Sequence, residues 1–144
     1  MSRRGGFTLL EVLLSISILA LLAGLSLPVY QSFLARNDID IAATTIANGL
    51  QRARLYAQTM QYDTTWGVSV QSNTMTLFKG ANFAARDTAY DETYAIPSNI
   101  TATGASEIVF AKVTATPSST GAINLANTAQ SRTISINARG MVEY

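Results

Sequence analysis

Residues 3–36 read RRGGFTLLEVLLSISILALLAGLSLPVYQSFLAR, and this stretch decides how the rest of the chain is organised. Two arginines precede two glycines, a single carboxylate follows at Glu11, and residues 12–35 carry no charge. As an α-helix, residues 12–35 would rise about 36 Å, enough to cross a hydrocarbon core of about 30 Å. A carboxylate in lipid is costly and tends to mark function, so Glu11 is a candidate functional residue.

The apolar run has two simple interpretations, a secretory signal peptide and a plain membrane anchor. A signal peptide has a short apolar run followed by a small-x-small cleavage site. Here the run is long, and the residues that follow it, LSLPVYQSFLAR, contain no convincing site of this kind. The small residues stand in front of the run instead, at Gly5 and Gly6.

The composition limits the function classes. A length of 144 residues indicates one small domain besides the N-terminal segment. The balance of 10 Lys and Arg against 9 Asp and Glu lacks the basic excess of a general nucleic-acid binder. The absence of cysteine and histidine excludes disulfides, thiol nucleophiles, Ser-His-Asp triads and ordinary zinc sites. We therefore expect no enzyme, no cofactor and no metal ion.

The first apolar run continues into an amphipathic helix. The steps between its apolar residues alternate between four and three, which predicts one helical face. These residues are Ile39, Ala43, Ile46, Leu50, Ala53, Ala57 and Met60. The pattern predicts one long helix from about Phe7 to about Gln61, apolar all round in its first half and amphipathic in its second.

Downstream, the apolar period changes to two, which predicts strands. The runs TTWGVSVQ and TMTLFKG predict a hairpin that turns at Ser72-Asn73. Further strands are predicted in EIVFAK from Glu107, in GAINLAN from Gly121 and in RTISINARGMVEY from Arg132, the last as a hairpin turning at 137–140. The segments GANFAARDTAYDETYAIPSN and TATPSST are predicted to be loops. The predicted fold class is α+β, with the long helix packed on a C-terminal antiparallel β-sheet.

The motif GGFTLLE resembles the class III signal of type IV prepilins and type II secretion pseudopilins. The resemblance implies a pilin fold and a cytoplasmic leader, residues 1–6. It implies that a membrane aspartyl prepilin peptidase cuts between Gly6 and Phe7 and N-methylates Phe7. Glu11 then matches the family's glutamate, five residues into the mature chain, and Pro28 matches a proline common in the family's membrane helix.

The same resemblance also implies domain boundaries for the rest of the chain and the partners of the protein. Residues 7–35 would be a transmembrane helix that becomes part of a filament core. Residues 36–144 would be the globular domain, with an amphipathic helix at 36–61 and the β-sheet at 64–144. The implied partners are other pilin or pseudopilin subunits, the peptidase, an inner-membrane assembly platform and, before assembly, membrane lipid. The implied location is a single pass through the inner membrane, followed by an extracellular or periplasmic filament.

Elementary physics agrees with these expectations. Arg3 and Arg4 hold the leader on the cytoplasmic side by the positive-inside rule. An ionised Glu11 in lipid seeks a cation, and the candidates are the Phe7 amine of a neighbouring subunit and the Phe7 amine of its own chain. We predict that Glu11 is an assembly residue. Pro28 removes a helical hydrogen bond, so it predicts either a kink with local melting or a proline tolerated without mechanical purpose.

The order of segments further resembles the GspH/FimT group of minor pilins and pseudopilins, through LQRARLYAQ, WGVSV, FKG, SSTGAINL and TISINARGMVEY. This implies a structural subunit of a type IV pilus or a type II secretion pseudopilus. The alternative is a minor pilin at the filament tip that binds DNA or a surface. Arg132 and Arg139 are the candidate DNA-binding residues, but they are few and lie near Glu143. Two arginines in a hairpin are more often solvated, so nucleic acid is not an expected partner.

Two smaller features have a functional and a plain interpretation. Asp87, Asp91 and Glu92 could hold calcium through their oxygens, or they could form a solvated acidic loop, which is the commoner case. Their spacing matches no EF-hand. The triplet from Asn99 to Thr101 matches a glycosylation sequon, which is weak evidence by itself.

Overall fold

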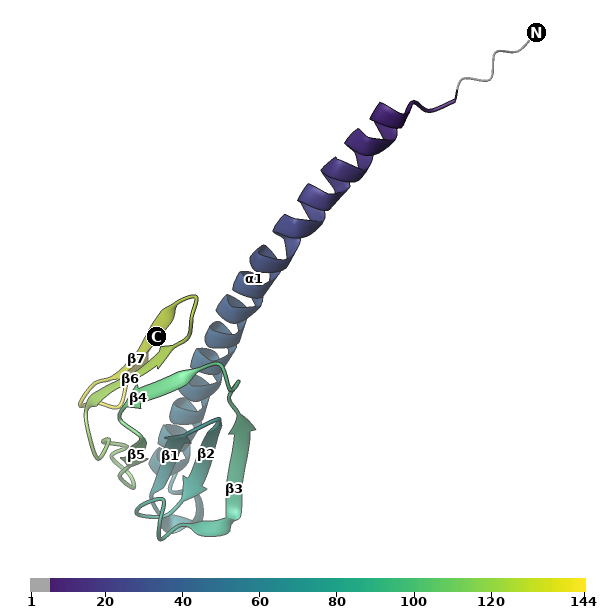
Figure 1. Cartoon of the computed structure of the whole chain (residues 1–144). Helices are drawn as coiled ribbons and strands as arrows, with labels where there is room; N and C mark the ends of the chain where they lie inside the picture. Colours follow the sequence, from purple (N-terminus) through teal and green to yellow (C-terminus); the bar gives the residue numbers. More distant parts are fainter. Residues whose placement is uncertain (1–5) are drawn as a thin grey trace. The chain divides into compact units, whose positions relative to one another are not determined.

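The structure, a computed structural model, describes residues 6–144, and for residues 25–28 it describes the helical backbone without the side chains. The chain divides into two compact units, Met1–Leu34 and Ala35–Tyr144. Helix α1 (Leu9–Gln58), with 50 residues, contributes to both units. The strands of the second unit gather beside the last turns of α1 (Figure 1).

The ends of α1 lie close to the predicted ones, and local chemistry explains the differences. The helix begins at Leu9 because Thr8 caps it: the hydroxyl oxygen of Thr8 accepts a hydrogen bond from the backbone N–H of Glu11 at 3.2 Å. It ends at Gln58, after which Met60 has a left-handed φ of 54°. A short 3₁₀ helix, η1 (Gln61–Asp63), follows. Met60 was predicted on the buried face, but it is 50% exposed because it lies beyond the helix end.

The remaining members of the predicted helical face are buried. Each is at most 2% exposed: Ile39, Ala43, Ile46, Leu50, Ala53 and Ala57. The period of 3.6 residues thus selected the packed face correctly. Ile39 is the first buried residue among those described in α1, so the packed part of the helix begins one turn into the second unit.

The strands form two four-stranded sheets, where one sheet was predicted. The first has the order β3 (Asp87–Ala95), β2 (Thr74–Lys79), β1 (Trp66–Gln71), β5 (Glu107–Phe110). The second has the order β4 (Thr101–Gly104), β6 (Gly121–Ala126), β7 (Ser131–Ile136), β8 (Val142–Glu143). All pairings are antiparallel, and the fold class α+β is confirmed.

Most of the predicted strands are confirmed, including the β1–β2 hairpin and the terminal β7–β8 hairpin. The prediction of a loop over residues 80–99 was wrong, because β3 lies within it. This strand pairs with β2 on one side only and is mostly exposed or half-exposed, so its sequence, DTAYDETYA, shows no apolar alternation. Charged residues are common on such an edge, where they discourage pairing with other chains. The short strand β4 was also not predicted.

One apolar core joins the packed face of α1 to strands of both sheets. The first sheet is also buried on its opposite face, where Gly67 pairs with Phe78 and with Val109. The ring of Phe78 packs edge-on against Phe83, with 5.6 Å between ring centroids. The loop between β2 and β3, which contains Phe83, therefore packs on this second face of the sheet at Phe78.

Candidate assembly segment

The predicted cleavage site lies in exposed, non-helical backbone before the start of α1. Gly6 and Phe7 are exposed and precede the first helical residue, Leu9. A Cβ atom placed on Gly6 would meet nothing within 4 Å. Within the described part of the chain, the peptide bond between Gly6 and Phe7 is thus free of helical hydrogen bonds and of packing.

Glu11 occupies the third position of the helix, and Thr8 caps it. Thr8-Leu-Leu-Glu11 has the spacing of a capping box, a signal for the helix start that our sequence reasoning missed. A negative charge in the first helical turn is favoured by the helix dipole. Glu11 is exposed, and within residues 6–24 and 29–144 no ion pair includes its carboxylate.

The apolar side chains that follow Glu11 are exposed wherever the structure describes them. Every described residue from 6 to 24 and from 29 to 34 is exposed. By length and composition, α1 could cross a membrane. The hydroxyl groups of Ser15 and Ser17 donate to the carbonyl oxygens of Glu11 and Leu13, at 2.8 and 2.7 Å. These polar groups are therefore satisfied inside the helix, as lipid requires.

Comparisons with known proteins match both the segment and the fold. A model of the prokaryotic N-terminal methylation motif matches residues 1–27. A fimbrial protein of Moraxella nonliquefaciens is 41% identical over 51 residues, which cover 35% of this chain and 32% of the Moraxella protein. The chain thus aligns with about a third of that relative's length.

The minor pseudopilin EpsH from the type 2 secretion system of Vibrio cholerae has a similar fold. The similarity has a TM-score of 0.55 at 8% identity, and it covers 74% of this chain and 94% of the pseudopilin. The chain is thus similar to type IV pilins and pseudopilins in its N-terminal segment and in its fold. The predicted pilin fold is confirmed by this similarity.

Several residues of the pilin motif lie where the structure gives no detail. Arg3 and Arg4 fall outside the described residues, and Pro28 falls among residues 25–28, whose side chains are not described. The predicted kink at Pro28 is therefore outside the described part of the chain. Gly24 is exposed, and a Cβ atom there would meet nothing within 4 Å.

The three acidic residues of the possible calcium site each pair with a different cation. Asp87 pairs with Lys79 at 3.3 Å, Asp91 with Arg86 at 2.7 Å, and Glu92 with Arg52 at 2.8 Å. Asp91 and Glu92 are neighbours on β3, and neighbouring residues of a strand point to opposite faces. Within the described residues, no group of three acidic side chains is placed to hold a metal ion.

Arg52 ties α1 to the edge strand β3. Its guanidinium donates to the hydroxyl oxygens of Tyr56 and Tyr94, at 2.9 and 2.7 Å, and to Glu92. The hydroxyl of Tyr94 donates in turn to Glu92 at 2.9 Å. The bond with Tyr56 does most to raise the pKa of Arg52 above its ordinary value, partial burial opposes it, and Glu92 and Tyr94 add to the rise. The network was missed from the sequence because β3 was missed.

The two candidate DNA-binding arginines stand at opposite ends of β7. The Nε atom of Arg132, near its start, lies 2.9 Å from a carboxylate oxygen of Asp40 on α1. Arg139 lies in the turn after β7, where its backbone N–H donates to the side chain of Asn137 at 2.9 Å. The fold does not bring the two guanidinium groups together. Asn99 of the sequon is exposed and donates from its side chain to Asp38 at 2.9 Å.

Proposed function

We propose that the chain is a structural subunit, a minor pilin or pseudopilin, of a type IV pilus or a type II secretion pseudopilus. The observation that carries the proposal is the contrast within α1, whose described residues before Leu34 are all exposed although most of them are apolar. Such a surface needs lipid first and then the helices of neighbouring subunits. Members of this family are structural proteins rather than enzymes.

Maturation begins with the leader. Prepilin peptidase cuts between Gly6 and Phe7 and N-methylates Phe7, while α1 spans the inner membrane once. The accessibility of this bond supports the proposal, because a protease binds its substrate as extended backbone and Gly6 has no side chain to clash. An inner-membrane assembly platform then moves the subunit from lipid into the filament.

Glu11 guides assembly. A carboxylate within lipid costs roughly 2.5–3.5 kcal/mol on insertion scales, so a cationic partner lowers the free energy of the assembled state. The new amine of Phe7 in a neighbouring subunit is that partner, and the amine of the same chain is the alternative. Support comes from the exposed carboxylate, for which the described part of the chain supplies no cation.

The choice of a minor subunit rests on the fold. Likeness to a minor pseudopilin, and the segments shared with the GspH/FimT group, favour this choice over a major pilin. Arg132 and Arg139 do not support the alternative of a DNA-binding subunit at the filament tip. Arg132 is paired with Asp40, and Arg139 lies beyond the opposite end of β7. Nucleic acid is therefore not a proposed partner.

Mass spectrometry of sheared filaments and of the membrane fraction tests the proposal. The mature protein should lack Met1 to Gly6 and carry one added methyl group, at low abundance relative to the main filament subunit. Gly6→Val should remain uncut, because a β-branched side chain obstructs the protease, while folding is unaffected since the site is open. Ser15→Ala, in the exposed helix, is the control and should be processed normally. A mature chain that begins beyond Ala23 would contradict the proposal.

A further inference from the structure

Arg36 is a cation without a carboxylate partner among the described side chains. It is exposed, and none of the ion pairs in the described part of the chain includes its guanidinium. Most other cations of the second unit are paired with a carboxylate: Arg52, Lys79, Arg86, Lys112 and Arg132. The guanidinium of Arg36 is therefore available to an anion from outside the chain.

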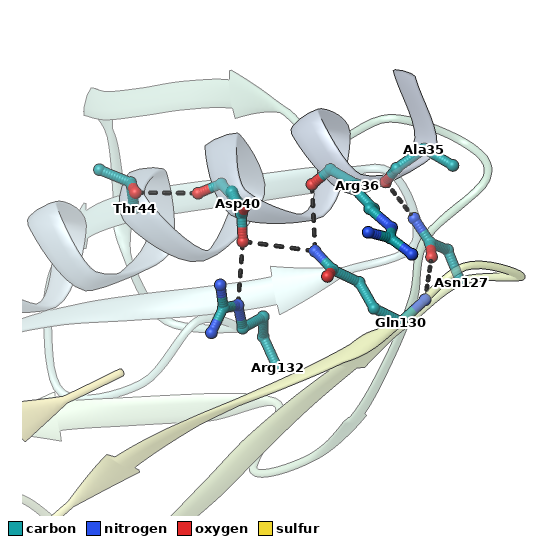
Figure 2. Close-up of polar contacts among 7 residues, drawn as sticks. All are labelled: Ala35, Arg36, Asp40, Thr44, Asn127, Gln130 and Arg132. Atoms are coloured by element: carbon teal, nitrogen blue, oxygen red, sulfur yellow. Dashed lines mark hydrogen bonds and ion pairs between the residues drawn. The ribbon is translucent and has the colours of Figure 1, made fainter. Parts of the chain in front are cut away.

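The backbone of Arg36 is held by the turn between β6 and β7, although its side chain is free. The side-chain amide of Gln130 donates to the carbonyl oxygen of Arg36 at 3.1 Å (Figure 2). That of Asn127 donates to the carbonyl oxygen of Ala35. The side-chain oxygen of Asn127 also accepts from the backbone N–H groups of Ala129 and Gln130, at 2.9 and 3.0 Å, and this Asx turn fixes the loop. The β6–β7 turn therefore lies beside residues 35 and 36 of α1.

The two carboxylates that follow Arg36 on α1 have other partners. Asp40 accepts from Arg132 at 2.9 Å and from Gln130 at 3.4 Å. Asp38 accepts from the side chain of Asn99 at 2.9 Å. Figure 2 shows the Arg36 side chain extending toward the β6–β7 turn rather than toward Asp40. Neither carboxylate thus neutralises Arg36.

The position of Arg36 along α1 indicates which anion it meets. Residues 12–35 are uncharged, and Arg36 follows Glu11 by about 38 Å along the helix axis. A helix with Glu11 near one edge of a hydrocarbon core of about 30 Å therefore places Arg36 in the opposite headgroup region. Tyr30, which is 61% exposed, lies less than two turns earlier, and tyrosine is enriched where membranes meet water. The anion at this level is the phosphate of a phospholipid.

We propose that Arg36 binds the phosphate of a phospholipid headgroup while α1 spans the membrane, and that the β6–β7 turn rests at the same level. A guanidinium suits this ligand because its planar N–H donors match two phosphate oxygens. The turn itself, residues 127–131, carries no carboxylate that would repel a phosphate. The ligand is lipid rather than free phosphate, because the membrane-spanning helix keeps headgroups beside Arg36 at high effective concentration. The inference rests on the proposed function, which places α1 in the inner membrane.

Solid-state NMR on the full chain in lipid bilayers tests this contact. The arginines carry ¹³C at the guanidinium carbon, and the bilayers contain phosphatidylcholine and phosphatidylglycerol. Dipolar recoupling to the ³¹P of the lipids weakens the signal of each guanidinium that lies beside a phosphate. Subtracting the spectrum of Arg36→Gln from that of the parent isolates the signal of Arg36.

The matched control is Arg139→Gln, which isolates the signal of another exposed arginine that no ion pair among the described residues includes. Its neighbour Gly140 lies beside Arg54, about 27 Å further along α1 than Arg36. The Arg36 signal should lose intensity under recoupling to phosphorus, whereas the Arg139 signal should keep its intensity.

An Arg36 signal that keeps its intensity in bilayers would overturn the proposal. If Arg36→Gln then still lowers incorporation into filaments, the partner of Arg36 is a carboxylate of a neighbouring subunit instead. The measurement needs neither peptidase nor filaments, so a chain that inserts without this contact refutes the present inference alone. A chain that does not enter the bilayer refutes the proposed function as well.

Discussion

The two halves of α1 are one continuous helix with opposite surroundings. In the first half, residues 9–24, every side chain is exposed, and Leu22 is 62% exposed. In the second half, one face is buried, and Leu50 is fully buried. Both halves are rich in apolar residues, but the first is apolar all round and the second on one stripe only. The distribution of apolar residues around the helix, more than their number, distinguishes a helix that needs partners from one that its own domain covers.

Separating the two halves of α1 should have the largest effect on the behaviour of the chain. A fragment covering residues 35–144 retains the buried face and both sheets, and it loses the exposed apolar surface of the first half. We expect it to be a folded, soluble α+β monomer, while the full chain stays in the membrane fraction. Size-exclusion chromatography and circular dichroism check this. An unfolded fragment, or one that requires detergent, would show that the first half also stabilises the domain.

Glu11 carries the charge in the otherwise uncharged first half, so its substitution tests what this half needs from its partners. Glu11→Leu should enter the membrane at least as well as the parent and should still be processed at Gly6. Its incorporation into filaments should fall by about tenfold or more, since a charge pair within lipid is lost. The ratio of filament-bound to membrane-bound protein measures the effect.

Two further variants at position 11 separate the effect of the charge on assembly from the effects of side-chain reach and size. Glu11→Asp keeps the charge with a shorter reach and should lie between the parent and Glu11→Leu. Glu11→Gln keeps the size of the side chain without its charge, and it should fail like Glu11→Leu. Filament incorporation of Glu11→Leu at the parental level would exclude Glu11 as an assembly residue.

In the second half, two leucines provide a matched pair. Leu50 is fully buried and Leu55 is 53% exposed, one and a half turns further along the same helix. Leu50→Ala in the fragment 35–144 should lower the free energy of unfolding by about 2–5 kcal/mol. Leu55→Ala should lower it by less than about 1 kcal/mol, since little apolar surface is lost from the core. Urea denaturation measures both, and similar losses for the two leucines would contradict the assigned buried face.

The same contrast explains how much of the fold the sequence could predict. The packed face of α1 and the strands β1, β2, β5, β6 and β7 were predicted because their apolar residues repeat at the period of a helix or a strand. The edge strand β3 was not, because pairing on one side and exposure on the other leave no apolar repeat. The Arg52 network and the hydrogen bonds from Asn99 and Asn127 to α1 join residues far apart in the sequence, and no local pattern marks them.

The candidate assembly segment likewise has features that the sequence could predict and features that were missed. Gly6, Phe7 and Glu11 stand in a motif that could be recognised directly. The capping role of Thr8 was readable from its spacing to Glu11 but was not used. For β1, the alternation of Trp66, Val68 and Val70 predicted one buried face. The second face of β1 is buried as well, and there the neighbouring Phe78 packs against Phe83, which lies in a loop without an apolar repeat.

Gly67 tests that second face of β1. A Cβ atom there would lie 2.6 Å from the Cζ atom of Phe78 and 2.9 Å from the backbone oxygen of Ile108. Gly67→Ala should therefore lower the free energy of unfolding by about 1–3 kcal/mol, the usual cost of overpacking. Gly121→Ala on β6 is the control, because its nearest neighbour would be at an ordinary 3.7 Å, and it should be neutral or slightly stabilising.

The double variant with Phe78→Leu divides the Gly67 effect between its two causes. A leucine does not extend to the position of Cζ, so the clash with the ring disappears, whereas the clash with the Ile108 backbone stays. In a double-mutant cycle, Gly67→Ala should thus cost less beside Phe78→Leu than beside Phe78, by about 0.5–1.5 kcal/mol. Additive effects would mean that the backbone of β5, and not the ring of Phe78, requires glycine at this position. A coupling of this size would show that the ring of Phe78, which packs against Phe83, covers Gly67 on the second face of β1.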